Sequence, residues 1–196
     1  MSWIQAVIHF QPGRELQSLS EASHMEVFAN IGRSLDRIGV GVRMIELTGA
    51  LMQSGQSNPM VLDLQVEALR MANKAEENVA NVWPHFAMRL AGVLGLAPAF
   101  RREEVAGLPS EGGWLRLDNG EVETHRPAGA PSVRASRAGL RTFAIFTRAA
   151  PEVILGMALE PGLLAEVNRL VDAYLHYQVD DAFPSRTARV LGQIGA

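Results

Sequence analysis

The residues with the clearest chemical character in this 196-residue chain are arginines in a stretch that contains no carboxylate. No acidic residue occurs between Glu123 and Glu152, and the same stretch holds five arginines: Arg126, Arg134, Arg137, Arg141 and Arg148. The last four follow one another at steps of three, four and seven, which would place them on one face of a helix. A face of one charge can follow the phosphate backbone of a nucleic acid.

A solvated helix face is the second interpretation of these arginines. Exposed arginines commonly pair with carboxylates, and several acidic residues precede the stretch: Glu103, Glu104, Asp118 and Glu121. The spacing alone favours this plain surface interpretation. The nucleic-acid interpretation therefore depends on what the rest of the chain indicates.

No other group of residues has the spacing of a catalytic or metal site. The single lysine, Lys74, does not follow a glycine-rich loop, so the chain has no phosphate-binding loop motif. No Gly-x-Ser-x-Gly motif marks a nucleophile. The histidines are scattered, without metal-ligand spacing on a helix: His9, His24, His85, His125 and His176. We predict no catalytic activity, no metal and no cofactor.

The composition limits the remaining classes of protein. The chain has no cysteine, which excludes disulfides and thiolate zinc sites and fits a reducing compartment. The formal net charge is −3 and the pI about 6.0, so any nucleic-acid surface must be a local positive patch. No apolar run reaches membrane-spanning length, and the first residues lack the basic leader of a signal peptide. We expect a cytoplasmic protein without membrane contact.

The elements that must position these arginines are mainly helices. Alternating apolar residues over 3–10, a turn at 11–13 and a short extended stretch at 15–19 predict a strand or hairpin at the N-terminus. Ser23 followed by Glu26 has the spacing of a capping box and predicts the start of the first helix. Asn58 before Pro59 predicts the start of another helix.

The second half of the chain predicts a small β insertion between helices. The stretch 98–131 is rich in glycine and proline, and Asp118-Asn119-Gly120 between short apolar runs predicts a hairpin turn. Helices are predicted again after Ser132, with a clear apolar stripe from Pro161 and a last short helix from Phe183. The predicted fold class is therefore mainly α, a helical domain with a small β insertion.

Several motifs occur in an order that resembles the bacterial RecO family of recombination mediators. The residues that carry the resemblance lie at 13–22 (GRELQSLSEA), 43–47 (RMIEL), 56–59 (QSNP), 86–98 (FAMRLAGVLGLAP), 174–177 (YLHY) and 184–186 (PSR). They cover nearly the whole chain. Each motif is weak alone, and the resemblance depends on their order.

The resemblance implies a domain organisation. RecO proteins carry an oligonucleotide-binding barrel before their helical domain, so residues 1–20 would be a remnant of that barrel and residues 21–196 the C-terminal helical domain. Most of the barrel would then be absent. We expect residues 1–20 to form strand without closing a barrel, and to pair with the insertion or with another chain. Many members also carry a four-cysteine zinc module where this chain has its insertion at 98–131, and no cysteine is present here.

The resemblance also implies a function and partners. The protein would bind single-stranded DNA, contact RecR and single-stranded-DNA-binding protein, and promote strand annealing and recombinase loading. Arg14 would lie on the barrel-derived surface and join the five arginines in DNA binding. Family members carry basic residues just before the helix phenylalanine, where this chain has Pro84 and His85, so Phe86 and Arg89 are the partner-binding candidates. The alternative is a helical protein-interaction module that lost DNA binding with its barrel.

Overall fold

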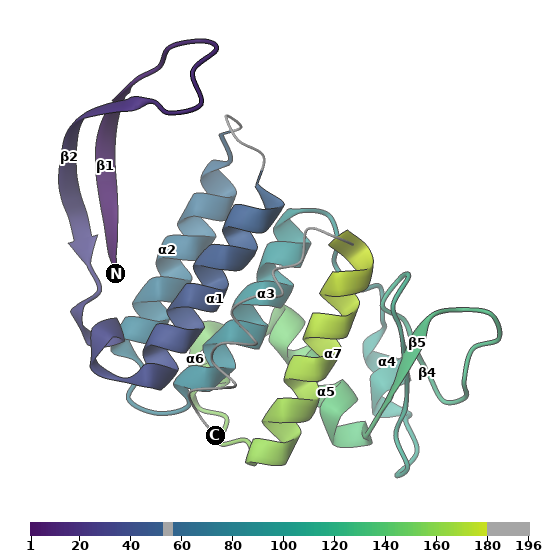
Figure 1. The fold of residues 1–196 in the computed structure, drawn as a ribbon. Coiled ribbons are helices and arrows are strands. Elements are labelled where there is room, and N and C mark those ends of the chain that lie inside the picture. Colours follow the sequence, from purple (N-terminus) through teal and green to yellow (C-terminus); the bar gives the residue numbers. More distant parts are fainter. Residues whose placement is uncertain (53–56, 180–196) are drawn as a thin grey trace.

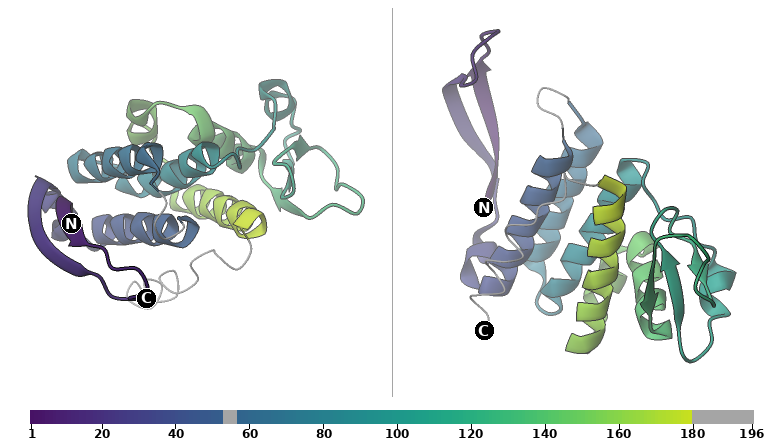
Figure 2. Two further views of the ribbon diagram at one scale, coloured as in Figure 1. Left: turned by 90° about the horizontal axis from the view of Figure 1, so that it is seen from above. Right: turned by 45° about the vertical axis from the view of Figure 1, so that its right-hand side comes forward.

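The computed structural model describes residues 1–52 and 57–179. A body of helices lies between two small sheets, a hairpin at the N-terminus and a three-stranded insertion on the opposite side (Figures 1 and 2). The mainly α fold class with small β elements is confirmed. In the part of the chain that the structure describes, no helix is long and apolar enough to cross a membrane.

The N-terminal hairpin consists of β1 (Ser2–His9) and β2 (Ser18–Val27), which pair with each other in antiparallel register. Gly13, with φ of +84°, lies in the connecting loop as the turn signal predicted. The hairpin is closed at its base, where the amide of Phe28 donates to the carbonyl of Met1 (2.9 Å). The ion pair between Arg70 and Glu26 (2.7 Å) links the hairpin to the helices.

The predicted start of the first helix is wrong. The chain remains extended through Ser23 and Glu26, and the first α-helix begins at Leu35 with the Ser34 side chain as its cap. A capping box satisfies only two backbone donors, whereas a partner strand satisfies donors along its whole length. The hairpin does not pair with the insertion, since the two sheets are separate, and pairing with another chain stays a prediction.

The helical body is built around α3, which packs against α1, α2, α5 and α7. Its residues from Val82 to Met88 are all buried, so the first two turns of the helix are surrounded on every side, as expected for a central helix. The helices and 3₁₀ segments of the body are η1 (Ala29–Arg33), α1 (Leu35–Leu51), α2 (Pro59–Lys74), η2 (Val79–Asn81), α3 (Val82–Val93), α5 (Arg137–Arg148), α6 (Pro151–Leu155) and α7 (Pro161–Val179).

The sequence signals for the ends of these helices are confirmed in the body. The Asn58 side chain accepts from the amide of Val61 (3.3 Å), and Pro59 occupies the first helical position of α2. Gly95, with φ of +79°, follows the end of α3. The predicted last helix from Phe183 lies outside the described residues.

The insertion consists of α4 (Arg102–Ala106), β3 (Gly113–Arg116), β4 (Val122–Glu123) and β5 (Ser132–Ala135). The strand order is β4-β3-β5, and all neighbours are antiparallel. Gly120, with φ of +77°, confirms the predicted hairpin turn. The insertion extends past residue 131, however, because residues 132–135 pair with β3 before α5 begins.

Candidate nucleic-acid and partner interface

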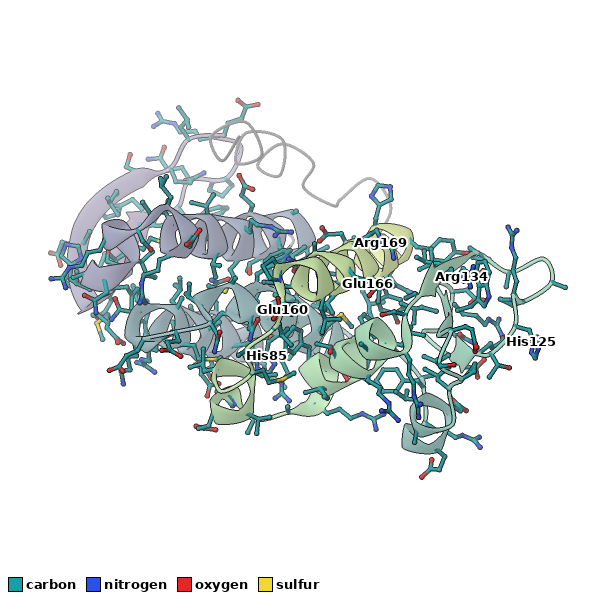
Figure 3. The ribbon with its side chains drawn as sticks, turned by 90° about the horizontal axis from the view of Figure 1, so that it is seen from below. His85, His125, Arg134, Glu160, Glu166 and Arg169 are labelled. Carbon is teal, nitrogen blue, oxygen red and sulfur yellow. The ribbon has the colours of Figure 1, made fainter. Side chains whose placement is uncertain are left out.

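The start of α5 is fixed by a carboxylate from α7. The Ser136 hydroxyl accepts from the amide of Gly139 (2.9 Å) and donates to Glu166 (2.6 Å), whose second oxygen accepts from the amide of Ser136 (2.8 Å). Figure 3 shows Glu166 on α7 and Arg134 on the neighbouring insertion sheet. The contact between Glu166 and Ser136 sets where the helix begins and therefore which way its arginines point.

Three of the predicted arginines share a face of α5. Arg137 and Arg141 donate to the carbonyl of Ala106 (3.2 and 3.4 Å), which lies at the C-terminal end of α4. Arg148 donates to the carbonyl of Phe100 (3.2 Å), and its guanidinium lies 5.0 Å from the centroid of the Phe100 ring. The side chains therefore connect α5 to the N-terminal part of the insertion.

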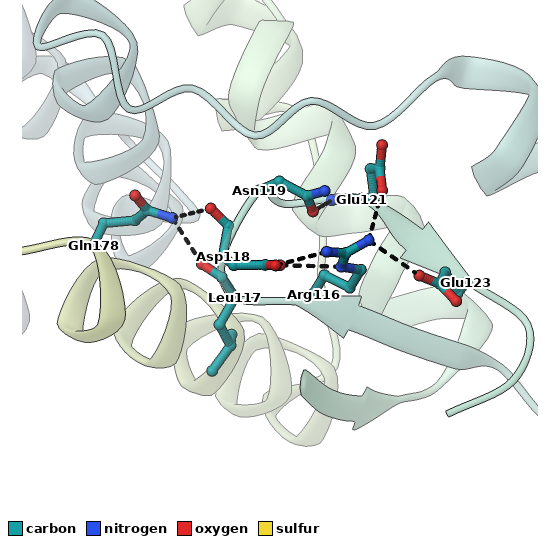
Figure 4. Close-up of polar contacts among 7 residues, drawn as sticks. All are labelled: Arg116, Leu117, Asp118, Asn119, Glu121, Glu123 and Gln178. Atoms are coloured by element: carbon teal, nitrogen blue, oxygen red, sulfur yellow. Dashed lines mark hydrogen bonds and ion pairs between the residues drawn. The ribbon is translucent and has the colours of Figure 1, made fainter. Parts of the chain in front are cut away.

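These three arginines do not pair with the carboxylates that the surface interpretation proposed. Within residues 1–52 and 57–179, none of the three forms an ion pair within 4.0 Å. Arg116 engages Asp118 (2.6 Å), Glu121 (3.2 Å) and Glu123 (3.6 Å) instead (Figure 4). Its hydrogen bonds lower the pKa of the Asp118 carboxyl. Backbone carbonyls are neutral, so no ion pair among the described residues compensates the positive charge along α5.

The other predicted arginines lie elsewhere. Arg134 is on β5 and not on the helix, because the strand pairing with β3 continues through that position. Arg126 belongs to the loop between β4 and β5, and its guanidinium lies 5.5 Å from the centroid of the Trp114 ring. Arg14 is in the hairpin loop, on the far side of the helical body (Figure 1). The predicted DNA-binding arginines therefore lie at separate places: the hairpin loop, the insertion sheet and α5.

A groove follows the α5 arginines. Its volume is about 690 Å³, and it is lined by Arg141 and Arg148 together with apolar residues that include Phe100, Ile145 and Val153. Ile145 and Val153 are 39% and 53% exposed, so the apolar surface is open to a partner.

Arg148 also belongs to a second groove, of about 330 Å³, that contains Arg89. The DNA-binding candidate Arg148 and the partner-binding candidate Arg89 thus lie on one surface, which their separation in sequence did not indicate. Phe86 is different, because only 1% of it is exposed and it packs in the core. A direct contact between Phe86 and a partner is therefore excluded in this conformation.

His85 links α3 to α5 beneath this surface. The ring is 6% exposed, and Nδ1 lies 3.0 Å from the carbonyl of Phe146. Burial lowers the pKa of His85, and the positive charge of Arg89 acts in the same direction. The imidazole is therefore held neutral and cannot replace the basic residue expected there.

The sequence patterns did not identify Trp114 as a candidate. The residue is half-buried on β3, next to Leu115, which is fully buried. The alternation of side chains along a strand could have indicated that one of the two faces outward. Among the described residues, no group of three His, Cys, Asp or Glu side chains could hold a metal ion.

Residues 32–187, which span the helical body and the insertion, match the family model described as "Recombination protein O C terminal". A DNA repair protein RecO from Salinibacter ruber is 39% identical over 194 residues, covering 99% of this chain and 75% of that protein. A DNA repair protein RecO from Moorella thermoacetica is 24% identical over 188 residues, which cover 90% of this chain and 67% of that protein. The chain belongs to the RecO family of DNA repair proteins.

Proposed function

We propose that this protein is a non-catalytic recombination mediator of the cytoplasm, which binds single-stranded DNA and promotes strand annealing and recombinase loading. RecR and single-stranded-DNA-binding protein are its proposed partners. Family membership supports a role in DNA repair. The observation that carries the DNA-binding part is the row of three arginines on α5, which form no ion pair within the described residues.

The α5 arginines suit phosphate for electrostatic reasons. A guanidinium has five N–H donors, and the acceptors that Arg137, Arg141 and Arg148 reach are neutral carbonyls. Each guanidinium therefore keeps its full charge for a ligand, and arginine matches the geometry of phosphate oxygens. Such contacts hold a nucleic acid without regard to sequence, which fits a mediator that acts along any single strand.

The paired grooves at Arg148 suit a peptide partner. Arg89 and Arg148 can bind carboxylates, while Ile145 and Val153 can cover apolar side chains. An acidic segment with apolar residues therefore fits this surface, and we assign it to single-stranded-DNA-binding protein. Phe86 supports the surface from the core.

The N-terminal hairpin fits the proposal that residues 1–20 are the remnant of an oligonucleotide-binding domain and that 21–196 form the C-terminal domain. Apolar side chains along it are largely exposed, including Ile8 (57%) and Phe10 (75%). Since β2 continues to Val27, the hairpin extends beyond the proposed boundary as a structural unit. Arg14 in its loop would add a DNA contact remote from α5.

Titration of labelled single-stranded DNA at two salt concentrations tests the proposal. The triple variant Arg137→Ala, Arg141→Ala, Arg148→Ala should bind more weakly, and the slope of log K against log salt should fall by about 0.7 for each phosphate that the variant no longer neutralises. Arg33→Ala, an exposed arginine on η1, is the matched control and should bind like the unmodified protein. A thermal melt checks that the triple variant is folded.

The second candidate function is a protein-interaction module without DNA binding. The apolar lining of the groove at Ile145 and Val153 favours it, because phosphate contacts do not need an apolar surface. Unchanged DNA affinity in the folded triple variant would discard the α5 site. Binding of an acidic peptide that is abolished by Arg89→Ala would then support the interaction module.

A further inference from the structure

The outer face of the insertion sheet presents an aromatic ring between charged residues. Trp114 on β3 is directly opposite Glu123 on β4 and Arg134 on β5, so the three side chains share one face. Leu115 on the opposite face is fully buried. The sheet therefore turns its apolar side to the helical body and Trp114 outward.

A pocket of about 550 Å³ lies at this face, within the size range of small-ligand sites. Trp114, Arg134, His125, Thr124 and Glu111 contribute to its lining. Figure 3 shows Arg134 and His125 together at the insertion end of the molecule. The planar guanidinium of Arg126 lies 5.5 Å from the centroid of the Trp114 ring.

Glycines keep the strands beside this pocket close together. A Cβ on Gly112, whose φ is +90°, would lie 2.1 Å from the carbonyl oxygen of Ala135. A Cβ on Gly113 would lie 2.5 Å from the carbonyl oxygen of Glu123. The carbonyl of Arg134 in turn accepts from Arg169 of α7 (3.2 Å), which fixes β5 against the body.

The pocket lining holds one carboxylate, and Glu123 on the same face is only partly neutralised, because it shares Arg116 with two other carboxylates. Glu123 forms an ion pair with Arg116 (3.6 Å), and the same guanidinium pairs with Asp118 and Glu121 (Figure 4). Glu111 is the carboxylate of the lining, and it accepts from the hydroxyl of Ser110 (3.0 Å). Arg126 and Arg134 thus outnumber the one carboxylate of the lining. Within the described residues, neither arginine forms an ion pair within 4.0 Å.

We propose that this pocket is a nucleotide-binding subsite for single-stranded DNA, in which a base stacks on Trp114 while Arg126 and Arg134 hold the flanking phosphates. The inference rests on the proposed function and adds a site distinct from the α5 arginines. The part of the Trp114 ring that faces solvent can accept any base, because every base has a flat π-face. Paired bases in a duplex stay stacked on each other, so the subsite selects single strands.

Tryptophan fluorescence and anisotropy with an oligo(dT) of about 16 nucleotides test the subsite. The oligonucleotide should quench the fluorescence of the unmodified protein and of Trp3→Phe, but not that of Trp114→Phe. By anisotropy, Trp114→Ala should bind roughly 5- to 100-fold more weakly. Leu62→Ala, which removes an exposed apolar side chain from α2, should leave affinity unchanged. Thermal melts of each variant confirm folding, and Trp114→Phe retains an aromatic ring if Trp114→Ala does not fold.

An abasic oligonucleotide of the same length separates stacking from phosphate contact. Removing the bases should weaken binding to the unmodified protein and change binding to Trp114→Ala little. Equal weakening for both proteins, or persistent quenching in Trp114→Phe, overturns the subsite. If the α5 triple variant alone has reduced affinity, the proposed function stands without this site. If the unmodified protein binds no single-stranded DNA, both proposals fail.

Discussion

Replacing Glu166 with alanine should destabilise the fold at the junction of β5 and α5. The carboxylate accepts from the amide of Ser136 (2.8 Å) and from its hydroxyl (2.6 Å), and its side chain is 22% exposed. The hydroxyl that donates to Glu166 is also the cap of α5, because it accepts from the amide of Gly139. The substitution therefore removes the acceptor that holds both the amide and the hydroxyl of the cap residue.

The expected magnitude follows from these contacts. A hydrogen bond to a charged group contributes about 1.5–3 kcal/mol, and a helix cap about 1 kcal/mol. Water can replace part of this stabilisation at a side chain that is partly exposed, so we expect the free energy of unfolding to fall by about 2–3 kcal/mol. For a chain of this size, the melting temperature should fall by roughly 5–10 °C.

Urea unfolding and a thermal melt measure this effect, with two further variants for comparison. Glu166→Gln keeps an acceptor without the charge and should lose about half as much stability. Glu76→Ala removes an exposed carboxylate after α2 and should stay within about 0.5 kcal/mol of the unmodified protein. If Glu166→Ala also stays within that range, the carboxylate does not hold the junction and the reasoning is wrong.

Three further predictions concern single positions. Because burial lowers the pKa of His85 in the folded protein, this histidine binds a proton more readily in the unfolded chain. The stability of the fold should therefore decrease as the pH falls below about 6.5. The variant His85→Gln, which can still donate to Phe146, should show a smaller decrease in melting temperature between pH 7.5 and pH 5.5. Gly120→Ala should cost more than about 2 kcal/mol in urea unfolding, because φ is +77° and the new Cβ would lie 2.2 Å from Pro98 Cβ. Asn58→Ala should lose about 1 kcal/mol with the cap of α2, and an unchanged urea midpoint would contradict this role.

Local signals predicted the helices well where nothing competed with them. Asn58 and Pro59 start a helix because both residues act within their own turn. Ser23 and Glu26 have an equally good spacing but lie in β2, because β1 pairs with the backbone along this stretch. The sequence shows the cap signal and does not show that an earlier strand lies alongside the same residues.

The candidate site was predictable only in part. The absence of acidic residues over 124–151 identified the arginines, and α5 does place Arg137, Arg141 and Arg148 on one face. The same spacing wrongly included Arg134, since it cannot show where a strand ends and a helix begins. The arginines of α5 bind the backbone carbonyls of Ala106 and Phe100. These are tertiary contacts to the backbone, so the residue types in the sequence do not predict them.

The arrangement of charge between the two proposed DNA sites limits how a strand can use them together. A pocket lined by Glu103, Glu104 and Glu123 shares Thr124 and His125 with the pocket at Trp114, so acidic side chains border the proposed base subsite. These carboxylates repel phosphate, and a single strand cannot follow a continuous positive path past them. The α5 arginines and the Trp114 subsite should therefore act as independent contacts. Their effects on binding free energy should add, because additivity holds for sites that share no partners.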